Sequence, residues 1–444
     1  MNRHTTPVFS TQHRLLGCGP ADSAGLLGFF LAVLCLLAGD ALRAATISTT
    51  GGSFDLGSTA TWAGGVIPGA GDTANFINAG TYTASNGSSF SFDGMTFNNN
   101  ASIEISPTTG NAITINLGPG GISGTTSNIS RLGSTNNLVT LALGANDQTW
   151  SVASGNTGAN ITGTARVELT SAAQTWLRGD NGGFTGTWKV NGSQLYVSEG
   201  DGKYGGVGVR MELLNGGALR MGGIGGAFTY GRGTVELVGD GSILVSQPGA
   251  AINTTVTTSQ PISGSGDLSL RVVGSRTDAK SILNLAGAYT HTGDTLVQGA
   301  ANSSQPFTVS LTSAGSMTFT IGANGVNNAI LDASGAGFND LTLDGTFLFD
   351  RSGPSIAEGN SWTIVGSGFD SLTYGPNFAV SGFTEQTPGL WTLTDADTTW
   401  SFNESTGNLA IVAVPEPSAL LLAFAGFGLL NWRSRRNRRR ASVR

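Results

Sequence analysis

The chain offers few side chains that could act as a general acid, base or nucleophile. Only one of its three histidines, His291, lies beyond the N-terminal segment. A polysaccharide lyase or hydrolase needs an acid and a base that converge from neighbouring elements. We interpret His291 as a solvent-facing turn or strand residue, and we predict no catalytic residue.

The carboxylates stand mostly as single aspartates before glycine, as in Asp93-Gly94, Asp240-Gly241 and Asp344-Gly345. Aspartate before glycine is typical of turns. The densest group, formed by Asp395, Asp397 and Glu404, carries oxygen ligands that calcium prefers, but its spacing matches no calcium loop. We therefore favour a solvated turn there and predict neither a metal nor a cofactor.

Tryptophans offer a different chemistry, because an exposed indole can stack on a sugar ring. A polysaccharide-binding protein therefore remains an alternative, although packing inside the core is the commoner fate of each indole. The tryptophans concerned are Trp62, Trp150, Trp176, Trp188, Trp362, Trp391 and Trp400.

Charge and cysteine content exclude further classes of function. Residues 45–414 hold 12 Lys or Arg against 25 Asp or Glu, a net charge of −13. This segment lacks the basic surface that nucleic-acid binding requires, and we exclude that function. Both cysteines, Cys18 and Cys35, fall in a segment that we expect to be removed. We therefore expect no disulfide and no cysteine nucleophile in the mature body.

The elements that would position any site are strands. Short alternating runs such as Val139–Leu143 and Leu268–Val272 are separated by Gly, Asn, Asp or Ser, and no stretch has a persuasive helical pattern. Phe184–Gly192 and Tyr289–Gly299 share an aromatic-Thr pair followed by Gly-x-x-x-Val-x-Gly. These patterns predict an all-β, right-handed parallel β-helix or β-solenoid over residues 45–413. At 20 to 25 residues per coil it would have about fifteen coils.

The N-terminal residues 1–44 have the order of a signal peptide. Arg3 and Arg14 precede an apolar run over residues 26–38, and small residues follow around Ala44. We expect a signal helix, export across the inner membrane and cleavage near Ala44.

The C-terminal residues 414–444 are tripartite. Pro415, Glu416 and Pro417 precede twelve apolar residues, 419–430, which predict a short hydrophobic helix. A cluster of arginines that would hold the extreme C-terminus on the cytoplasmic side follows: Arg433, Arg435, Arg436, Arg438, Arg439 and Arg440. A twelve-residue helix spans about 18 Å of a hydrocarbon core of about 30 Å, which favours transient retention over permanent anchoring.

This tail resembles the PEP-CTERM sorting signal. The resemblance implies that Pro415, Glu416 and Pro417 are recognised by a membrane-embedded exosortase, after which the protein reaches the cell surface or the extracellular matrix. An ordinary C-terminal membrane anchor is the alternative.

Segments of the body resemble autotransporter-associated β-strand repeats. We recognise no translocator domain of the autotransporter kind in this sequence. We therefore expect the C-terminal tail to determine how the protein reaches the cell surface. The segments are Ala60–Gly65, Pro68–Ala74, Phe92–Asn99, Phe184–Gly192, Tyr289–Gly299, Leu341–Phe347 and Trp400–Leu409.

Together these features predict an exported, non-enzymatic structural or adhesin-like protein of the cell surface or extracellular matrix. Its partners would be an exosortase and the membrane during sorting, and an exopolysaccharide is a further candidate partner. A polysaccharide-binding protein and a carbohydrate-active β-helix enzyme, either lyase or hydrolase, remain the alternatives.

Overall fold

The computed structural model describes most of residues 44–413. The residues not described within that range are 52–53, 85–87, 99–102, 108–111, 125–128, 133–137, 153–154, 171–173, 199, 248–251, 275–277, 301–304, 306, 334–337, 354–356 and 397. The expected signal helix and the sorting tail lie outside the described residues. Within the described part, no helix has the length and apolar character needed to cross a membrane.

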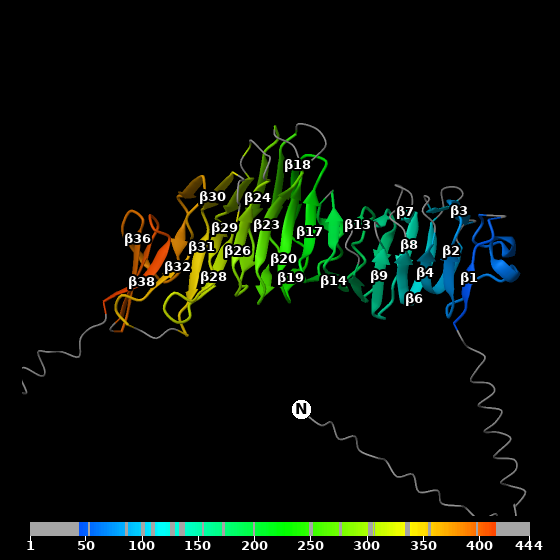
Figure 1. Ribbon diagram of the computed structural model, residues 1–444, viewed down its shortest axis with the longest axis horizontal. Coiled ribbons are helices and arrows are strands. Elements are labelled where there is room, and N and C mark those ends of the chain that lie inside the picture. Colours follow the sequence, from blue (N-terminus) through cyan, green and yellow to red (C-terminus); the bar gives the residue numbers. More distant parts are fainter. Residues whose placement is uncertain are drawn as a thin grey trace, which may run out of the picture. The chain divides into compact units, whose positions relative to one another are not determined.

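The body is an all-β parallel solenoid of about 10 turns, as the alternating sequence pattern predicts (Figure 1). Each strand pairs in parallel with the strand of the next coil. In the described residues, only three short 3-10 turns interrupt the strands: η2 (Thr59–Thr61), η3 (Ala63–Gly65) and η4 (Asp201–Lys203).

The first sheet has 16 strands and runs through the solenoid from one end to the other. Its members are β1 (Thr46–Ser48), β2 (Thr73–Phe76), β4 (Ser89–Phe97), β6 (Ile113–Gly124), β8 (Val139–Ala142), β9 (Gln148–Val152), β11 (Asn160–Thr162), β12 (Arg166–Leu169), β14 (Thr187–Asn191), β16 (Arg210–Leu214), β19 (Thr234–Leu237), β22 (Ile262–Gly264), β25 (Ala288–Tyr289), β28 (Ser316–Thr320), β31 (Thr346–Asp350) and β34 (Ala379–Val380).

The second sheet has 11 strands from successive coils. They are β3 (Gly80–Ala84), β5 (Ile103–Pro107), β7 (Ile129–Leu132), β10 (Gly155–Thr157), β13 (Gln174–Leu177), β15 (Gln194–Val197), β17 (Gly217–Gly222), β20 (Gly241–Ser246), β23 (Leu268–Val273), β26 (Thr295–Gln298) and β29 (Ile330–Asp332).

A third sheet of six strands joins the coils only from β18 onward. Its members are β18 (Gly226–Tyr230), β21 (Thr254–Thr258), β24 (Ser281–Leu285), β27 (Phe307–Leu311), β30 (Asn339–Leu343) and β33 (Ser371–Tyr374).

The expectation of about fifteen coils was wrong, because the solenoid has about 10 turns, although the expected length of 20 to 25 residues per coil holds in the coils from β12 to β16, before the third sheet. Before the third sheet begins, Trp188 pairs with Met211 in the next coil. Later, Leu270 pairs with Val297 in the next coil. The Asp267 N–H likewise donates to Asp240, which lies 27 residues earlier in the chain. The extra strand of the third sheet lengthens each coil, so the same chain makes fewer turns.

The proposed sequence repeat also does not match equivalent positions of the coil. Val190 lies in β14 of the first sheet, whereas its aligned partner Val297 lies in β26 of the second sheet. In both segments, inward and outward residues alternate. Their sequence similarity therefore reflects the residue preferences of a strand and does not mark the same position in two coils.

The core is a continuous stack of inward side chains. Five of the seven tryptophans are buried in it, and Trp150 and Trp188 pack edge to face with their ring centroids 5.6 Å apart. The five are Trp62, Trp150, Trp188, Trp362 and Trp400. Each coil thus adds apolar area to one shared interior.

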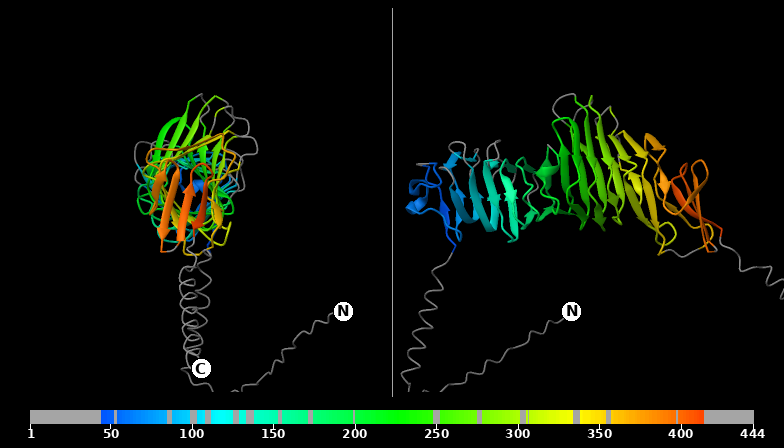
Figure 2. Two further views of the ribbon diagram at one scale, coloured as in Figure 1. Left: turned by 90° about the vertical axis from the view of Figure 1, so that its left-hand side faces the viewer. Right: turned by 180° about the vertical axis from the view of Figure 1, so that it is seen from behind.

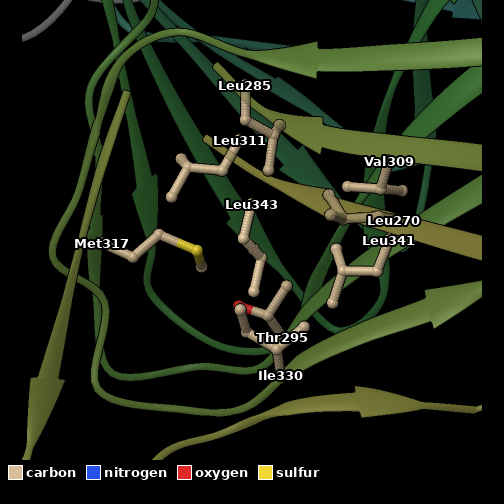
Figure 3. Close-up of a pocket in the computed structure, with 9 residues that line it drawn as sticks. All are labelled: Leu270, Leu285, Thr295, Val309, Leu311, Met317, Ile330, Leu341 and Leu343. Carbon is tan, nitrogen blue, oxygen red and sulfur yellow. The ribbon is translucent and has the colours of Figure 1, made fainter. Parts of the chain in front are cut away.

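A small void with a volume of about 10 Å³ lies in the described part of this core (Figure 3). Leucines from several coils point into it, together with Met317, Val309, Ile330 and the single polar residue Thr295. The void is about the size that one water could occupy, so the interior is close-packed.

The last strands depart from the parallel pattern. A fourth sheet of five strands is antiparallel. In the end-on view of Figure 2, its orange strands lie in front of the coils. Phe402 of this sheet packs on Phe347 and Phe349 of β31, with centroids 5.9 and 5.8 Å away. The sheet therefore covers the end of the apolar stack. Its strands are β32 (Ser361–Thr363), β35 (Thr384–Thr387), β36 (Leu390–Asp395), β37 (Thr398–Asn403) and β38 (Asn408–Ala413).

Candidate functional site

His291 is a core residue, so the prediction of a solvent-facing position was wrong. Its side chain is 1% exposed, and its Nε2 lies 2.9 Å from the hydroxyl of Thr295. Burial lowers the pKa of His291 to about 4, against the weaker opposing effect of the Asp267 carboxylate. The imidazole is therefore neutral at physiological pH and enclosed by protein, which leaves a substrate no access to it.

Aspartates before the strands of the second sheet form a ladder along the coils. Asp240 Oδ1 accepts a hydrogen bond from the backbone N–H of Asp267 at 3.1 Å, and Asp267 Oδ1 accepts one from Asp294 at 2.8 Å. Asp294 Oδ1 then accepts one from the Ala329 N–H at 2.8 Å. Sequence reasoning assigned Asp240 to a turn but missed this ladder. The signal was present, because Gly-Asp recurs at residues 239, 266 and 293.

The two described members of the acidic group, Asp395 and Glu404, contact different partners. Asp395 lies 3.7 Å from the guanidinium of Arg351, whereas Glu404 accepts a hydrogen bond from Trp391 Nε1 at 2.7 Å. Asp397 lies outside the described residues. In the described part of the chain, no three His, Cys, Asp or Glu side chains are grouped in a way that could hold a metal ion.

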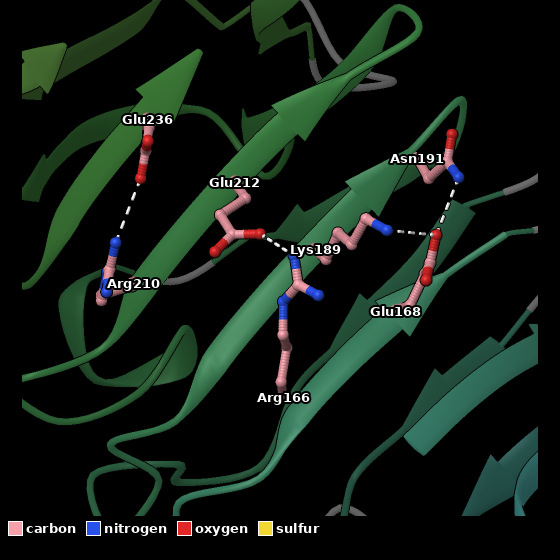
Figure 4. A network of polar contacts seen from close by, with 7 residues as sticks. All are labelled: Arg166, Glu168, Lys189, Asn191, Arg210, Glu212 and Glu236. Carbon is pink, nitrogen blue, oxygen red and sulfur yellow. Dashed lines mark hydrogen bonds and ion pairs between the residues drawn. The ribbon is translucent and has the colours of Figure 1, made fainter. Parts of the chain in front are cut away.

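Charged side chains of both signs line the outer face of the first sheet (Figure 4). Glu168, Lys189, Glu212 and Glu236 occupy one register position in four successive strands, β12, β14, β16 and β19. Lys189 Nζ lies 2.9 Å from Glu168, and Arg210 lies 3.1 Å from Glu236. The resulting contacts join neighbouring coils.

Arg166 extends this charged ladder over two coils. Its guanidinium pairs with Glu212, 46 residues further along the chain. That hydrogen bond raises the pKa of Arg166. One arginine thereby ties β12 to β16 across the strand between them.

A shallow groove of about 130 Å³ lies beside the charged ladder, lined in part by Asp147, Arg166 and Glu168. Two carboxylates and a cation thus share the lining of this groove. A hydrogen bond from Asn191 at 2.8 Å, helped by Lys189, lowers the pKa of Glu168. Glu168 is therefore held as a carboxylate and cannot donate a proton as a general acid at neutral pH.

The outer face of the second sheet carries one of the two described tryptophans that are not fully buried, the half-buried Trp176 of β13. Trp176 stacks on Tyr196 with ring centroids 4.7 Å apart and planes inclined by 30°. The guanidinium carbon of Arg178 lies 3.6 Å from the Trp176 ring centre, and that of Arg220 lies 4.7 Å from the Tyr196 ring centre. We call these four residues the arginine–aromatic stack.

Polar contacts fix the orientation of this stack. Arg220 donates to Gln174 Oε1 at 2.7 Å and to the hydroxyl of Ser246 at 2.9 and 3.2 Å. Burial lowers the pKa of Arg220, which still stays far above neutrality. Trp176 Nε1 donates to Ser198 at 3.3 Å. The second partly exposed indole, Trp391, lies in the fourth sheet and bonds to Glu404 instead.

The residues of the sorting motif, Pro415, Glu416 and Pro417, lie outside the described residues. So do the arginines expected to set membrane topology: Arg433, Arg435, Arg436, Arg438, Arg439 and Arg440.

Comparison with known proteins found no matching family model, no matching curated protein and no matching solved structure.

Proposed function

We propose that this chain is an exported, non-enzymatic structural protein of the cell surface or extracellular matrix, with an adhesin-like solenoid body. The observation that carries the proposal is the use of its carboxylates. The side chains that could perform acid–base chemistry instead hold one coil to the next.

Two kinds of contact support this role. Asp240, Asp267 and Asp294 each accept a backbone N–H from the following coil, and Glu168, Glu212 and Glu236 pair with cations on other coils. Contacts between nearest neighbours add up along a solenoid, so they favour mechanical continuity over a localised active centre.

Covered ends support the same role. At the C-terminal side the fourth sheet packs Phe402 on β31, and at the N-terminal side Trp62 packs on Phe76 of β2, with ring centroids 5.7 Å apart. Solenoids whose ends are covered stay soluble as single rods instead of adding to one another end to end.

The destination rests on the two termini of the sequence. The signal-peptide order of residues 1–44 supports export, and the PEP-CTERM-like tail of residues 414–444 supports transient membrane retention and processing by an exosortase. We further propose that the coils are right-handed, as parallel crossover connections almost always are. Short hydrophobic helices would flank the body at residues 26–38 and 419–430.

The experiment places one epitope tag directly after Ala44 and a second after Arg444, in cells with and without the exosortase. With the exosortase, we expect the first tag in the extracellular fraction and the second separated from it. Without the exosortase, both tags should remain together in the membrane fraction. Two tags that stay joined and membrane-bound in both strains would contradict processing and establish an ordinary anchor.

A further inference from the structure

We propose that the outer face of the second sheet between β13 and β26 binds a linear acidic polysaccharide through Arg178, Arg220 and Arg271. This inference rests on the proposed function, because it assumes that the body meets polysaccharide outside the cell. It goes further by assigning one face, one ligand class and the residues that recognise it.

The strands of the proposed binding face differ in charge from the rest of the body. The strands β13, β15, β17, β20, β23 and β26 contain no Asp or Glu, although residues 45–414 carry a net charge of −13. These strands therefore carry no carboxylate that would repel an anionic ligand, and the aspartates that directly precede β20, β23 and β26 each accept a backbone N–H. An anionic ligand gains most at such a surface.

The basic side chains of the first and second sheets also differ in whether they are paired with carboxylates. There, Arg166, Lys189 and Arg210 each pair with a glutamate. Among the described residues, neither Arg178 nor Arg271 has an ion pair or a hydrogen bond from its guanidinium. The exposed Arg271 thus presents unused donors to solvent, whereas the partly exposed Arg178 has a buried Nε without a hydrogen-bond partner.

A further argument is the linear spacing of these groups. Trp176, Tyr196, Arg220, Leu244 and Arg271 share one register position in five successive strands. Neighbouring strands are about 4.8 Å apart, so Arg220 and Arg271 are separated by about 10 Å along the coils, and the whole row covers about 19 Å. Such a row fits charges repeated along a polymer better than one small anion.

The chemistry of the arginine–aromatic stack favours carboxylates on sugars. Guanidinium groups bind carboxylates with paired hydrogen bonds, and stacking on Trp176 and Tyr196 holds Arg178 and Arg220 in fixed planes. The partly exposed glutamines Gln174, Gln194 and Gln298 add donors and acceptors for sugar hydroxyls beside the row. A uronic-acid polymer supplies both kinds of group.

The test measures binding of the purified full chain to a linear polyuronate, with its carboxyl-reduced neutral derivative and a single-stranded oligonucleotide as comparison probes. We expect the polyuronate to bind and the neutral derivative not to bind. R178Q/R271Q should lower the polyuronate affinity by about tenfold or more, because charged hydrogen bonds to carboxylate are lost. R271Q alone removes an exposed, unpaired side chain and should lower it severalfold without affecting folding.

The matched control is R166Q/R210Q, which removes two positive charges from the first sheet. It should leave the polyuronate affinity within about twofold of the original, because screening limits the reach of surface charges to about 10 Å. Equal losses in both double variants, or no polyuronate binding at all, would overturn the assignment of the second sheet. An oligonucleotide that binds as tightly as the polyuronate would overturn the ligand class. Because purified protein is used, these outcomes are independent of whether export and tail processing occur.

Discussion

The carboxylate of Asp267 accepts a hydrogen bond from the backbone N–H of Asp294, at 2.8 Å, in the next coil. The N–H of Asp267 in turn donates to Asp240 in the preceding coil. The carboxylate of each of these aspartates therefore accepts one hydrogen bond from the coil that follows it. The contacts satisfy backbone donors at the starts of strands, where the ladder of the sheet has not yet begun.

The first prediction concerns this aspartate ladder. Asp267→Ala removes the acceptor for the Asp294 N–H and should lower local stability by about 1 kcal/mol. Asp267→Asn keeps a carbonyl oxygen in place and should lose less. Hydrogen exchange at the Asp294 amide measures the effect directly, and equal exchange in both variants would show that the acceptor oxygen is unimportant.

The second prediction concerns pH. Burial lowers the pKa of His291 from 6.5 to about 4 in the folded chain. Between these values the unfolded chain binds a proton that the folded chain refuses, so the free energy of unfolding decreases as the pH falls. The loss attributable to His291 should reach about 3 kcal/mol near pH 4 and then level off.

His291→Gln, which cannot titrate, is the reference for this measurement. The difference in unfolding free energy between the original chain and the variant should be constant above about pH 7.5 and shift in favour of the variant as the pH falls to about 4. A difference that stays constant over the whole range would show that His291 is accessible to protons in the folded state.

The third prediction compares two glycines with nearly the same backbone conformation. Gly121 and Gly144 have φ of +63° and +64°. A Cβ at Gly121 would lie 2.3 Å from the carbonyl oxygen of Thr149, whereas one at Gly144 would have no neighbour within 4 Å. Gly144→Ala should therefore cost about 1 kcal/mol through the left-handed backbone alone. Gly121→Ala should cost about 3 kcal/mol because it also pushes β6 away from β9. Thermal unfolding compares them, and equal costs would contradict the close approach.

The fourth prediction concerns the core beside the void. Leu311 is 1% exposed and points into this void together with Leu343 and Met317. Leu311→Ala enlarges the void and should lower the free energy of unfolding by about 3 kcal/mol. Leu311→Met keeps the volume and should cost less than about 1.5 kcal/mol. Denaturant titration of both variants checks this, and a small loss in Leu311→Ala would mean that the coils collapse around the gap.

The sequence was sufficient to predict strands and a solenoid. Alternation in Val139–Leu143 and Leu268–Val272 reports the inward and outward faces directly, because side chains in a strand alternate with a period of two. The number of coils was not predictable in this way. It depends on where the third strand of each coil begins, and residues 226–230 look like any other short strand.

Residue environments at the site were harder to predict than strands. His291 follows Thr290 and precedes Thr292, which suggested a polar turn, yet its neighbour Thr295 supplies an internal hydrogen-bond partner. The arginine–aromatic stack joins residues of β13, β15 and β17, and their proximity depends on the register between coils. The 27-residue recurrence of Gly-Asp allows the register between coils to be proposed from β20 onward. The stack lies in earlier strands, which this recurrence does not reach.

We propose that the PEP-CTERM-like tail of residues 414–444 delivers the solenoid body to the outside of the cell. The most direct measurement is antibody labelling of the body on intact cells that produce either the original chain or P415A/E416A/P417A. We predict surface or released label for the original chain, and cell-retained, membrane-associated protein for the variant. Equal surface labelling of the two chains, or no label outside the cell for the original, would contradict the account.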